Sequence, residues 1–143
     1  MSNFPPSPFG RDISSQDIVE TMQAFKGWEE RYRQVIQWGK KLPKMPEELK
    51  SDQVTVSGCE STVWLVSENI DGKWYFCADS DARIVRGLIA IVLAAYEGKS
   101  SEEIAAFNID EYFDLLGLVA HLSPSRGNGL KAIVEQIKLA ASL

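Results

Sequence analysis

The chain has 143 residues and a formal net charge of −5, and 45% of its residues are hydrophobic and 24% charged. This length and composition are typical of one globular domain with a core of its own, and they exclude a disordered or fibrous protein. The acidic charge and the absence of a basic block disfavour a protein that binds nucleic acid through its phosphates.

The N-terminal segment MSNFPPSPFGRD lacks the basic start and the apolar stretch of a secretory signal. Its prolines predict an extended arm over residues 1–13, within a single domain that spans residues 1–143. The longest apolar run, residues 87–96, is shorter than the roughly 20 residues that a membrane-spanning helix needs. We therefore expect a cytoplasmic protein with no membrane partner, in which the cysteines stay reduced.

Two helices are predicted in the first third of the chain. Ser14 has the position of an N-cap, and Asp17 adds negative charge to the first turn of the first helix. The second helix is expected over residues 28–38, because Gly39 is typical of a helix end, and a loop is expected over residues 43–53. The side chains expected to face the core from these helices are Ile18, Met22, Phe25, Tyr32, Val35 and Ile36.

The middle of the chain predicts a β-hairpin. Residues 54–56 (VTV) alternate like a short strand, and residues 62–68 form a second strand whose apolar centre suggests burial on both faces. Residues 69–72 (NIDG) are a turn signal, and residues 73–78 (KWYFCA) are strongly β-prone. These segments predict a small antiparallel sheet of about three strands.

Four further helices follow the hairpin. Residues 79–81 (DSD) are predicted to cap an apolar helix over residues 82–96, which we expect to be the central, most buried one. Ser100 and Glu103 fit a capping box, residues 110–116 look helical, and Ser123 with the following proline begins the last helix. The residues expected to point inward from that last helix are Leu130, Ile133, Val134 and Ile137. The predicted fold class is α+β, with the sheet packed against several helices.

Metal and nucleotide motifs are missing from the sequence. Structural zinc uses about four clustered ligands, whereas this chain offers Cys59, Cys77 and a single His121 without a CxxC pair. A P-loop and a GxGxxG motif are also absent, so we expect no bound cofactor and no metal. We expect Cys77 to be a small buried hydrophobe within its strand and His121 to be a capping or core histidine. A hydrolase that pairs Cys59 with His121 stays formally open.

Cys59 lies in the segment VSGCES, where a loop joins a strand. Gly58 permits backbone conformations that are closed to other residues, and Glu60 and Ser61 are polar. The thiolate is the nucleophilic form of cysteine, and an ordinary thiol is only a few per cent ionised at pH 7. From the residues alone, a packing role and a nucleophilic role of Cys59 are about equally supported.

Residues 123–129 (SPSRGNG) are the other unusual segment. Each glycine in the first turns of a helix costs roughly 1 kcal/mol relative to alanine, so we expect something to pack close to this backbone. A helix N-terminus that carries Arg126 attracts anions such as a thiolate or a persulfide. The alternative is a surface salt bridge of Arg126.

Six segments, taken together and in order, are similar to those of a known family. They are WEERY (28–32), GKKLP (39–43), VSGCES (56–61) leading to VWL, DSDA (79–82), IVRGL (84–88) and HLSPSR (121–126). They resemble the SufE family of sulfur-acceptor proteins over residues 15–141, and Pro8-Phe9-Gly10 resembles the CsdE branch of that family.

The resemblance implies an α+β fold related to U-type cluster scaffolds, and a sulfur relay. A pyridoxal-phosphate cysteine desulfurase would form a persulfide, from which Cys59 takes the terminal sulfur for Fe–S assembly or another thiolation pathway. The pyridoxal phosphate would belong to this partner. Gly58, as a pivot, and Glu60, Ser61 and Arg126 are expected to support Cys59 or to dock the desulfurase. Two alternatives are a non-catalytic, allosteric regulator of a desulfurase and a metal-binding scaffold.

Overall fold

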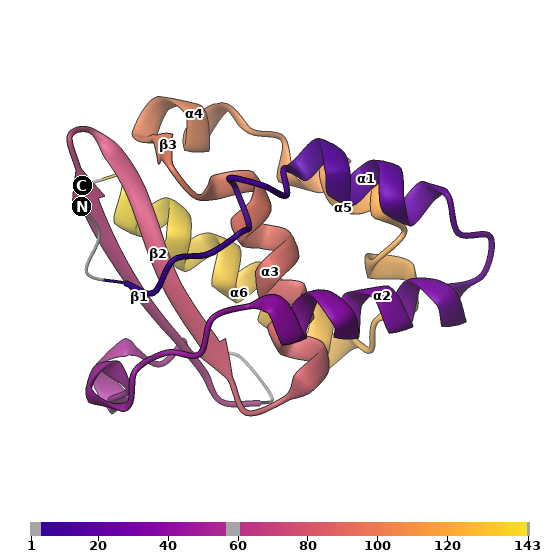
Figure 1. The fold of residues 1–143 in the computed structure, drawn as a ribbon, viewed down its shortest axis with the longest axis horizontal. Coiled ribbons are helices and arrows are strands. Elements are labelled where there is room, and N and C mark those ends of the chain that lie inside the picture. The colour runs from indigo at the N-terminus through magenta and orange to yellow at the C-terminus, as the bar shows by residue number, and fades with distance from the viewer. Residues whose placement is uncertain (1–3, 57–60, 143) are drawn as a thin grey trace.

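The computed structural model describes residues 4–56 and 61–142. Over these residues the chain forms six α-helices, three 3-10 helices and an antiparallel sheet with the strand order β1-β2-β3 (Figure 1). The α-helices are α1 (Ser15–Gln23), α2 (Trp28–Lys41), α3 (Arg83–Tyr96), α4 (Ser101–Ala106), α5 (Ile109–Leu116) and α6 (Pro124–Ala141). The 3-10 helices are η1 (Glu47–Leu49), η2 (Asp52–Val54) and η3 (Val119–His121), and the strands are β1 (Val63–Ile70), β2 (Lys73–Ser80) and β3 (Lys99–Ser100). The predicted α+β class is confirmed.

β1 and β2 form the predicted hairpin, and they pair antiparallel along their whole length. Asp71 and Gly72, which connect them, have φ angles of 54° and 84°, and these positive values are typical of a type I′ turn. β1 is an edge strand, and most of its residues are only partly buried. The predicted burial of this strand on both faces is therefore wrong.

Residues 54–56 do not form the predicted strand. Val54 ends the 3-10 helix η2, and Thr55 makes one isolated antiparallel bridge to Trp64. The side-chain hydroxyl of Thr55 donates a hydrogen bond of 2.8 Å to the carbonyl oxygen of Asp52. This local bond closes a turn where the alternating sequence predicts an extended segment.

α3 is the central helix, as its apolar sequence predicts. All of its residues except Arg83 and Arg86 are buried, and it packs against α2, β2 and α6 (Figure 1). The cap predicted for this helix is wrong, because its N-cap residue is Ala82, whose side chain makes no capping bond. Asp79 and Ser80, which were expected to cap it, are the last residues of β2.

α2 crosses α3 at very close range through two glycines. A Cβ atom on Gly87 would lie 2.1 Å from the carbonyl oxygen of Val35, and one on Gly39 would lie 2.8 Å from the nitrogen of Gly87. A side chain at either position would push the helices apart. Gly39 therefore does not end α2 as predicted, and the helix continues to Lys41. Tyr32, expected to face the core, is 43% exposed.

Serine side chains cap three helices, as the sequence predicts. Ser14 and Ser100 form capping boxes at the starts of α1 and α4, and Ser123 accepts a hydrogen bond from the backbone N–H of Arg126 in α6. The predicted inward side chains of α6 are all buried. Local capping chemistry therefore determines where these helices begin.

The N-terminal arm lies against the domain over its described part, residues 4–13. Phe9 has no exposed surface, and it forms a parallel bridge with Ile13. Between them Gly10 has a φ of 87°, and a Cβ atom there would lie 2.6 Å from the Cβ atom of Glu97. The arm thus packs on the end of α3 and contributes an aromatic side chain to the core.

Candidate functional site

The structure describes the chain up to Val56 and again from Ser61, on the two sides of the predicted nucleophile in the sequence. Gly58, Cys59 and Glu60 lie outside the described residues, and their predicted roles stay predictions. Val56 is 7% exposed, and Ser61 is partly buried. Two groups of described residues define the geometry of the site. They are the residues at both ends of the VSGCES motif and the residues that face them.

Both flanks of the motif are attached to the start of the hairpin. The backbone N–H of Val56 donates a hydrogen bond of 2.9 Å to the carbonyl oxygen of Val63. On the other side, the carbonyl oxygen of Thr62 accepts hydrogen bonds from the hydroxyl of Ser80, at 2.7 Å, and from the N–H of Asp81, at 3.4 Å. These bonds fix both flanks beside the junction between β2 and α3.

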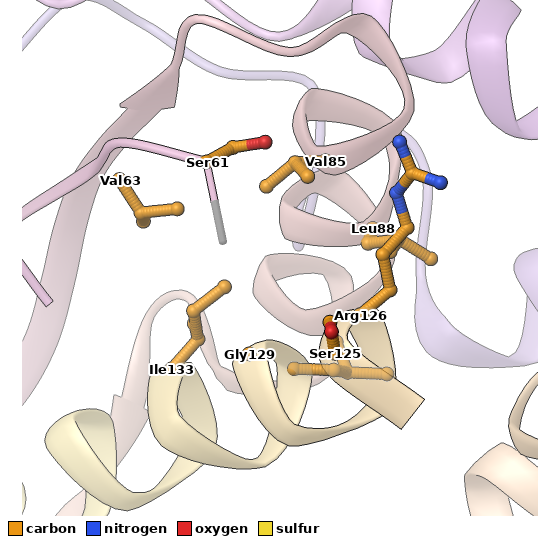
Figure 2. Close-up of a pocket in the computed structure, with 9 residues that line it drawn as sticks. Ser61, Val63, Val85, Leu88, Ser125, Arg126, Gly129 and Ile133 are labelled. Carbon is orange, nitrogen blue, oxygen red and sulfur yellow. The ribbon is translucent and has the colours of Figure 1, made fainter. Parts of the chain in front are cut away.

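A small cavity opens next to Ser61, between β1, α3 and α6 (Figure 2). Its volume is about 20 Å³, which is room for about one water molecule. Its polar residues are Ser61, Ser125 and Arg126, and its remaining walls are mainly apolar. The apolar residues that line it are Val63, Val85, Leu88, Leu130 and Ile133. The structure thus brings together Ser61 and Arg126, which are far apart in the sequence.

Arg126 is the third residue of α6, and Figure 2 shows its side chain extending from the first turn beside Leu88 of α3. Its Nε–H group is buried and has no hydrogen-bond partner among the described residues. The surface salt bridge considered from the sequence is absent from the described part of the chain, where no carboxylate lies within 4.0 Å of this guanidinium. An unsatisfied donor of this kind costs about 1–3 kcal/mol, so it favours an acceptor or an anion at this position.

The two glycines of α6 behave differently. Gly129 is buried and lines the cavity. A Cβ atom on Gly127 would meet nothing within 4 Å, so close packing does not explain Gly127. The predicted close packing is therefore wrong for Gly127 and stays a prediction for Gly129.

Cys77 is a buried side chain of β2, as predicted, and is 6% exposed. Burial, together with the negative charges of Asp79 and Glu97, raises the pKa of its thiol to about 11. At neutral pH almost none of this thiol is ionised, and a thiol is a poor nucleophile in that state. Cys77 is therefore a packing residue.

His121 is neither a capping nor a core histidine, so that prediction is wrong. It is exposed at the end of η3, and its ring stacks on the ring of Trp28 at the start of α2. The ring centroids are 4.5 Å apart, and the ring planes differ by 10°. Sequence reasoning missed this contact, although both residues lie in the segments WEERY and HLSPSR, which carried the family resemblance.

Residues 4–56 and 61–142 contain no group of three or more His, Cys, Asp or Glu side chains that could hold a metal ion. Over the same residues, none of the helices has both the length and the apolar character needed to cross a bilayer. A metal site that includes Cys59, which lies outside these ranges, stays an alternative.

Comparison with known proteins gives a family match over nearly the whole chain. The SufE model, described as an Fe-S metabolism associated domain, matches residues 16–141. The sulfur acceptor protein CsdE of Escherichia coli is 45% identical over 137 residues, which cover 94% of this chain and 92% of CsdE. An uncharacterized SufE-like protein of Rhizobium etli is 44% identical over 134 residues, covering 91% of this chain and 90% of its own length.

Among solved structures, a hypothetical protein from Thermus thermophilus matches with a TM-score of 0.73 and 18% sequence identity. The match covers 90% of this chain and 93% of the other. At this identity the likeness bears on the fold alone. The fold match and the family match both extend over nearly the whole chain.

Proposed function

Because this chain belongs to the SufE family, we propose that it accepts sulfur from a cysteine desulfurase as a persulfide on Cys59, and stimulates that desulfurase by doing so. The observation that carries the proposal is the 45% identity, over 94% of the chain, to a protein named as a sulfur acceptor. The sulfur then passes to Fe–S cluster assembly or to another thiolation pathway.

The proposed step is a thiol exchange between two proteins. The thiolate of Cys59 attacks the terminal sulfur of a persulfide on the desulfurase, and a new S–S bond forms. The S–S bond within the desulfurase breaks, and its cysteine leaves as a thiolate. One sulfur atom has moved, and no external oxidant or reductant is required. Pyridoxal phosphate, in this proposal, stays with the desulfurase, where the persulfide is made.

The described residues supply chemistry that favours such a step. Ser61 lines the cavity, and Cys59 precedes it by two residues in the sequence. Arg126 lines the same cavity at the N-terminus of α6, where the helix dipole and the guanidinium both favour a negative charge. We propose that the buried Nε–H of Arg126 stabilises a thiolate or persulfide carried on Cys59, since this donor lacks a partner in the described residues.

The second candidate is a regulator that stimulates the desulfurase by docking, without accepting sulfur. A docking protein needs only a surface, and this chain presents Tyr32 and Leu139 with 43% and 59% of their surface exposed. The two candidates differ in whether Cys59 is required.

The test measures the rate at which a pyridoxal-phosphate cysteine desulfurase releases alanine from cysteine in the presence of this protein. We expect the unmodified chain to raise the rate and Cys59→Ser to abolish the increase, because a hydroxyl cannot take up the sulfur. Cys77→Ala is the matched control, and it should stimulate like the unmodified chain. If Cys59→Ser stimulated as well as the unmodified chain, the acceptor role would be wrong and docking alone would explain the effect.

A further inference from the structure

We propose that the start of α2 holds the connector between α5 and α6, defined as residues 117–123, and that this contact sets the position of Arg126 in the cavity. In this proposal Trp28, Arg31 and His121 are positioning residues for sulfur transfer. The proposal rests on the proposed function for its role in catalysis, whereas the contacts themselves are independent of that function.

The first contact is the stack of His121 on Trp28. The two rings are nearly parallel, with centroids 4.5 Å apart, and they join η3 to the first residue of α2. His121 is exposed, so the ring is not held there by burial in the core. A stacked pair of rings has a preferred geometry, and it therefore fixes the direction in which the connector leaves η3.

The second contact is made by Arg31, one turn further along α2. Its guanidinium donates hydrogen bonds to the carbonyl oxygen of Leu116, the last residue of α5, at 3.5 Å, and to that of Phe25, at 3.2 Å. A Cβ atom on Gly117 would lie 2.9 Å from Nη1 of Arg31, so the guanidinium packs tightly on the first residue of the connector. Two side chains from one turn of α2 thus hold the connector at its beginning and at its middle.

The connector leads directly into the first turn of α6. Ser123 caps this helix and accepts a hydrogen bond of 3.3 Å from the N–H of Arg126. Arg126 follows His121 by five positions in the sequence, and its side chain lines the cavity beside Leu88 (Figure 2). If the connector moved, the cap and the first turn would move with it, and the Nε–H group of Arg126 would leave its buried position.

Later turns of α6 are held separately. Leu130, Ile133 and Ile137 are at most 2% exposed and belong to the core. Loss of the stack should therefore leave the helix and the fold in place and should displace only the first turn. This separation makes the proposal testable without unfolding the protein.

The functional test compares His121→Ala with His121→Phe, which keeps an aromatic ring on Trp28. We expect His121→Ala to slow persulfide formation on Cys59 by about threefold to tenfold, and His121→Phe to restore the rate to within about twofold. Gln136→Ala changes an exposed side chain in the second half of α6 and should leave the rate unchanged. Equal rates for His121→Ala and the unmodified chain would overturn the positioning role.

The structural test follows the Nε–H signal of Arg126 by NMR, and it requires no sulfur transfer. We expect His121→Ala to shift this signal and to speed its exchange with solvent at least about threefold, and His121→Phe to restore both. An unchanged signal in His121→Ala would refute the contact itself. If the unmodified chain formed no persulfide on Cys59, the proposed function would fail, while the NMR result would still decide the positioning proposal.

Discussion

Asp79→Ala is expected to lower the free energy of unfolding by about 3–5 kcal/mol, because it removes one partner of a buried ion pair. Asp79 is 2% exposed, and its carboxylate pairs with the guanidinium of Arg86 in α3. It also accepts hydrogen bonds from the backbone N–H groups of Met45, at 3.0 Å, and Ser80, at 2.7 Å. Without the carboxylate, a mostly buried positive charge and two buried N–H groups would lose a partner.

The ion pair also connects three elements of the fold. Arg86 donates further hydrogen bonds to the carbonyl oxygens of Gly39, at 3.2 Å, and Leu42, where α2 ends. It thereby joins the end of α2 to α3, while Asp79 joins both to β2. The network lies close to Thr62, which precedes β1, so we expect its loss to loosen the region that flanks the VSGCES motif as well.

Asp81→Ala is the matched control for this prediction. Asp81 is exposed and lies two positions from Asp79, so its replacement should change stability by less than about 0.5 kcal/mol. Urea denaturation of both variants at pH 7, followed by circular dichroism, measures the difference. Similar stabilities of Asp79→Ala and Asp81→Ala would mean that the buried pair contributes little to this fold.

The second large effect concerns Glu97, whose ionisation should destabilise the protein. Glu97 is 7% exposed, and its burial is the main reason why the net pKa of its carboxyl group is raised from 4.5 to about 7. The N–H of Phe76, which donates a hydrogen bond of 2.7 Å, and the charge of Arg11 lower this pKa and offset only part of the increase. The folded protein therefore keeps a proton on Glu97 at pH values where the unfolded chain has lost it.

Since the folded pKa is raised, the stability contributed by Glu97 is fully present below pH 4.5 and is lost as the pH rises through about 7. The full loss is on the order of 3 kcal/mol. Glu97→Gln keeps an oxygen to accept the Phe76 bond and cannot ionise. We expect it to match the unmodified chain near pH 4.5 and to be more stable at pH 8, by up to this amount.

The measurement is the difference in unfolding free energy between Glu97→Gln and the unmodified chain from pH 4.5 to pH 8. Other titrating groups contribute equally to both proteins and cancel in the difference. Gln136→Ala, at an exposed position in α6, removes no titrating group and should show a difference that does not change with pH. A difference for Glu97→Gln that stayed constant over this range would contradict the raised pKa.

Local sequence patterns predicted the elements that depend on local interactions. The NIDG turn forms because Asp71 and Gly72 accept positive φ angles, and the serine caps at Ser14, Ser100 and Ser123 satisfy N–H groups within their own first turns. The burial of α3 follows from its apolar composition. These features require no knowledge of distant residues.

The errors arose where distant residues determine the outcome. Gly39 resembles a helix end, but its role is to let α2 approach Gly87 of α3. Asp79 resembles a helix cap, but it is buried with Arg86 as its partner. Tyr32 has the spacing of an inward side chain, but the buried face of α2 is narrow. The Tyr32 side chain lies outside that face and is 43% exposed. At Gly39 and Asp79, a contact between elements prevailed over a local preference.

The sequence predicted which residues belong to the candidate site, but it predicted only part of how they are arranged in space. The family resemblance pointed to Ser61 and Arg126, and the structure brings both to one cavity. The sequence could not indicate that the cavity wall comes from three elements, or that Trp28 stacks on His121. Such contacts depend on how α2, α3 and α6 pack, and a single sequence contains no direct signal for that.

The most direct test of the acceptor role locates the transferred sulfur. The unmodified chain is incubated with a cysteine desulfurase and cysteine, its thiols are alkylated, and its peptides are weighed by mass spectrometry. We predict that the peptide with Cys59 gains one sulfur atom and that the peptide with buried Cys77 gains none. An unmodified Cys59 peptide, under conditions in which the desulfurase turns over, would contradict the proposal that this chain accepts sulfur at Cys59.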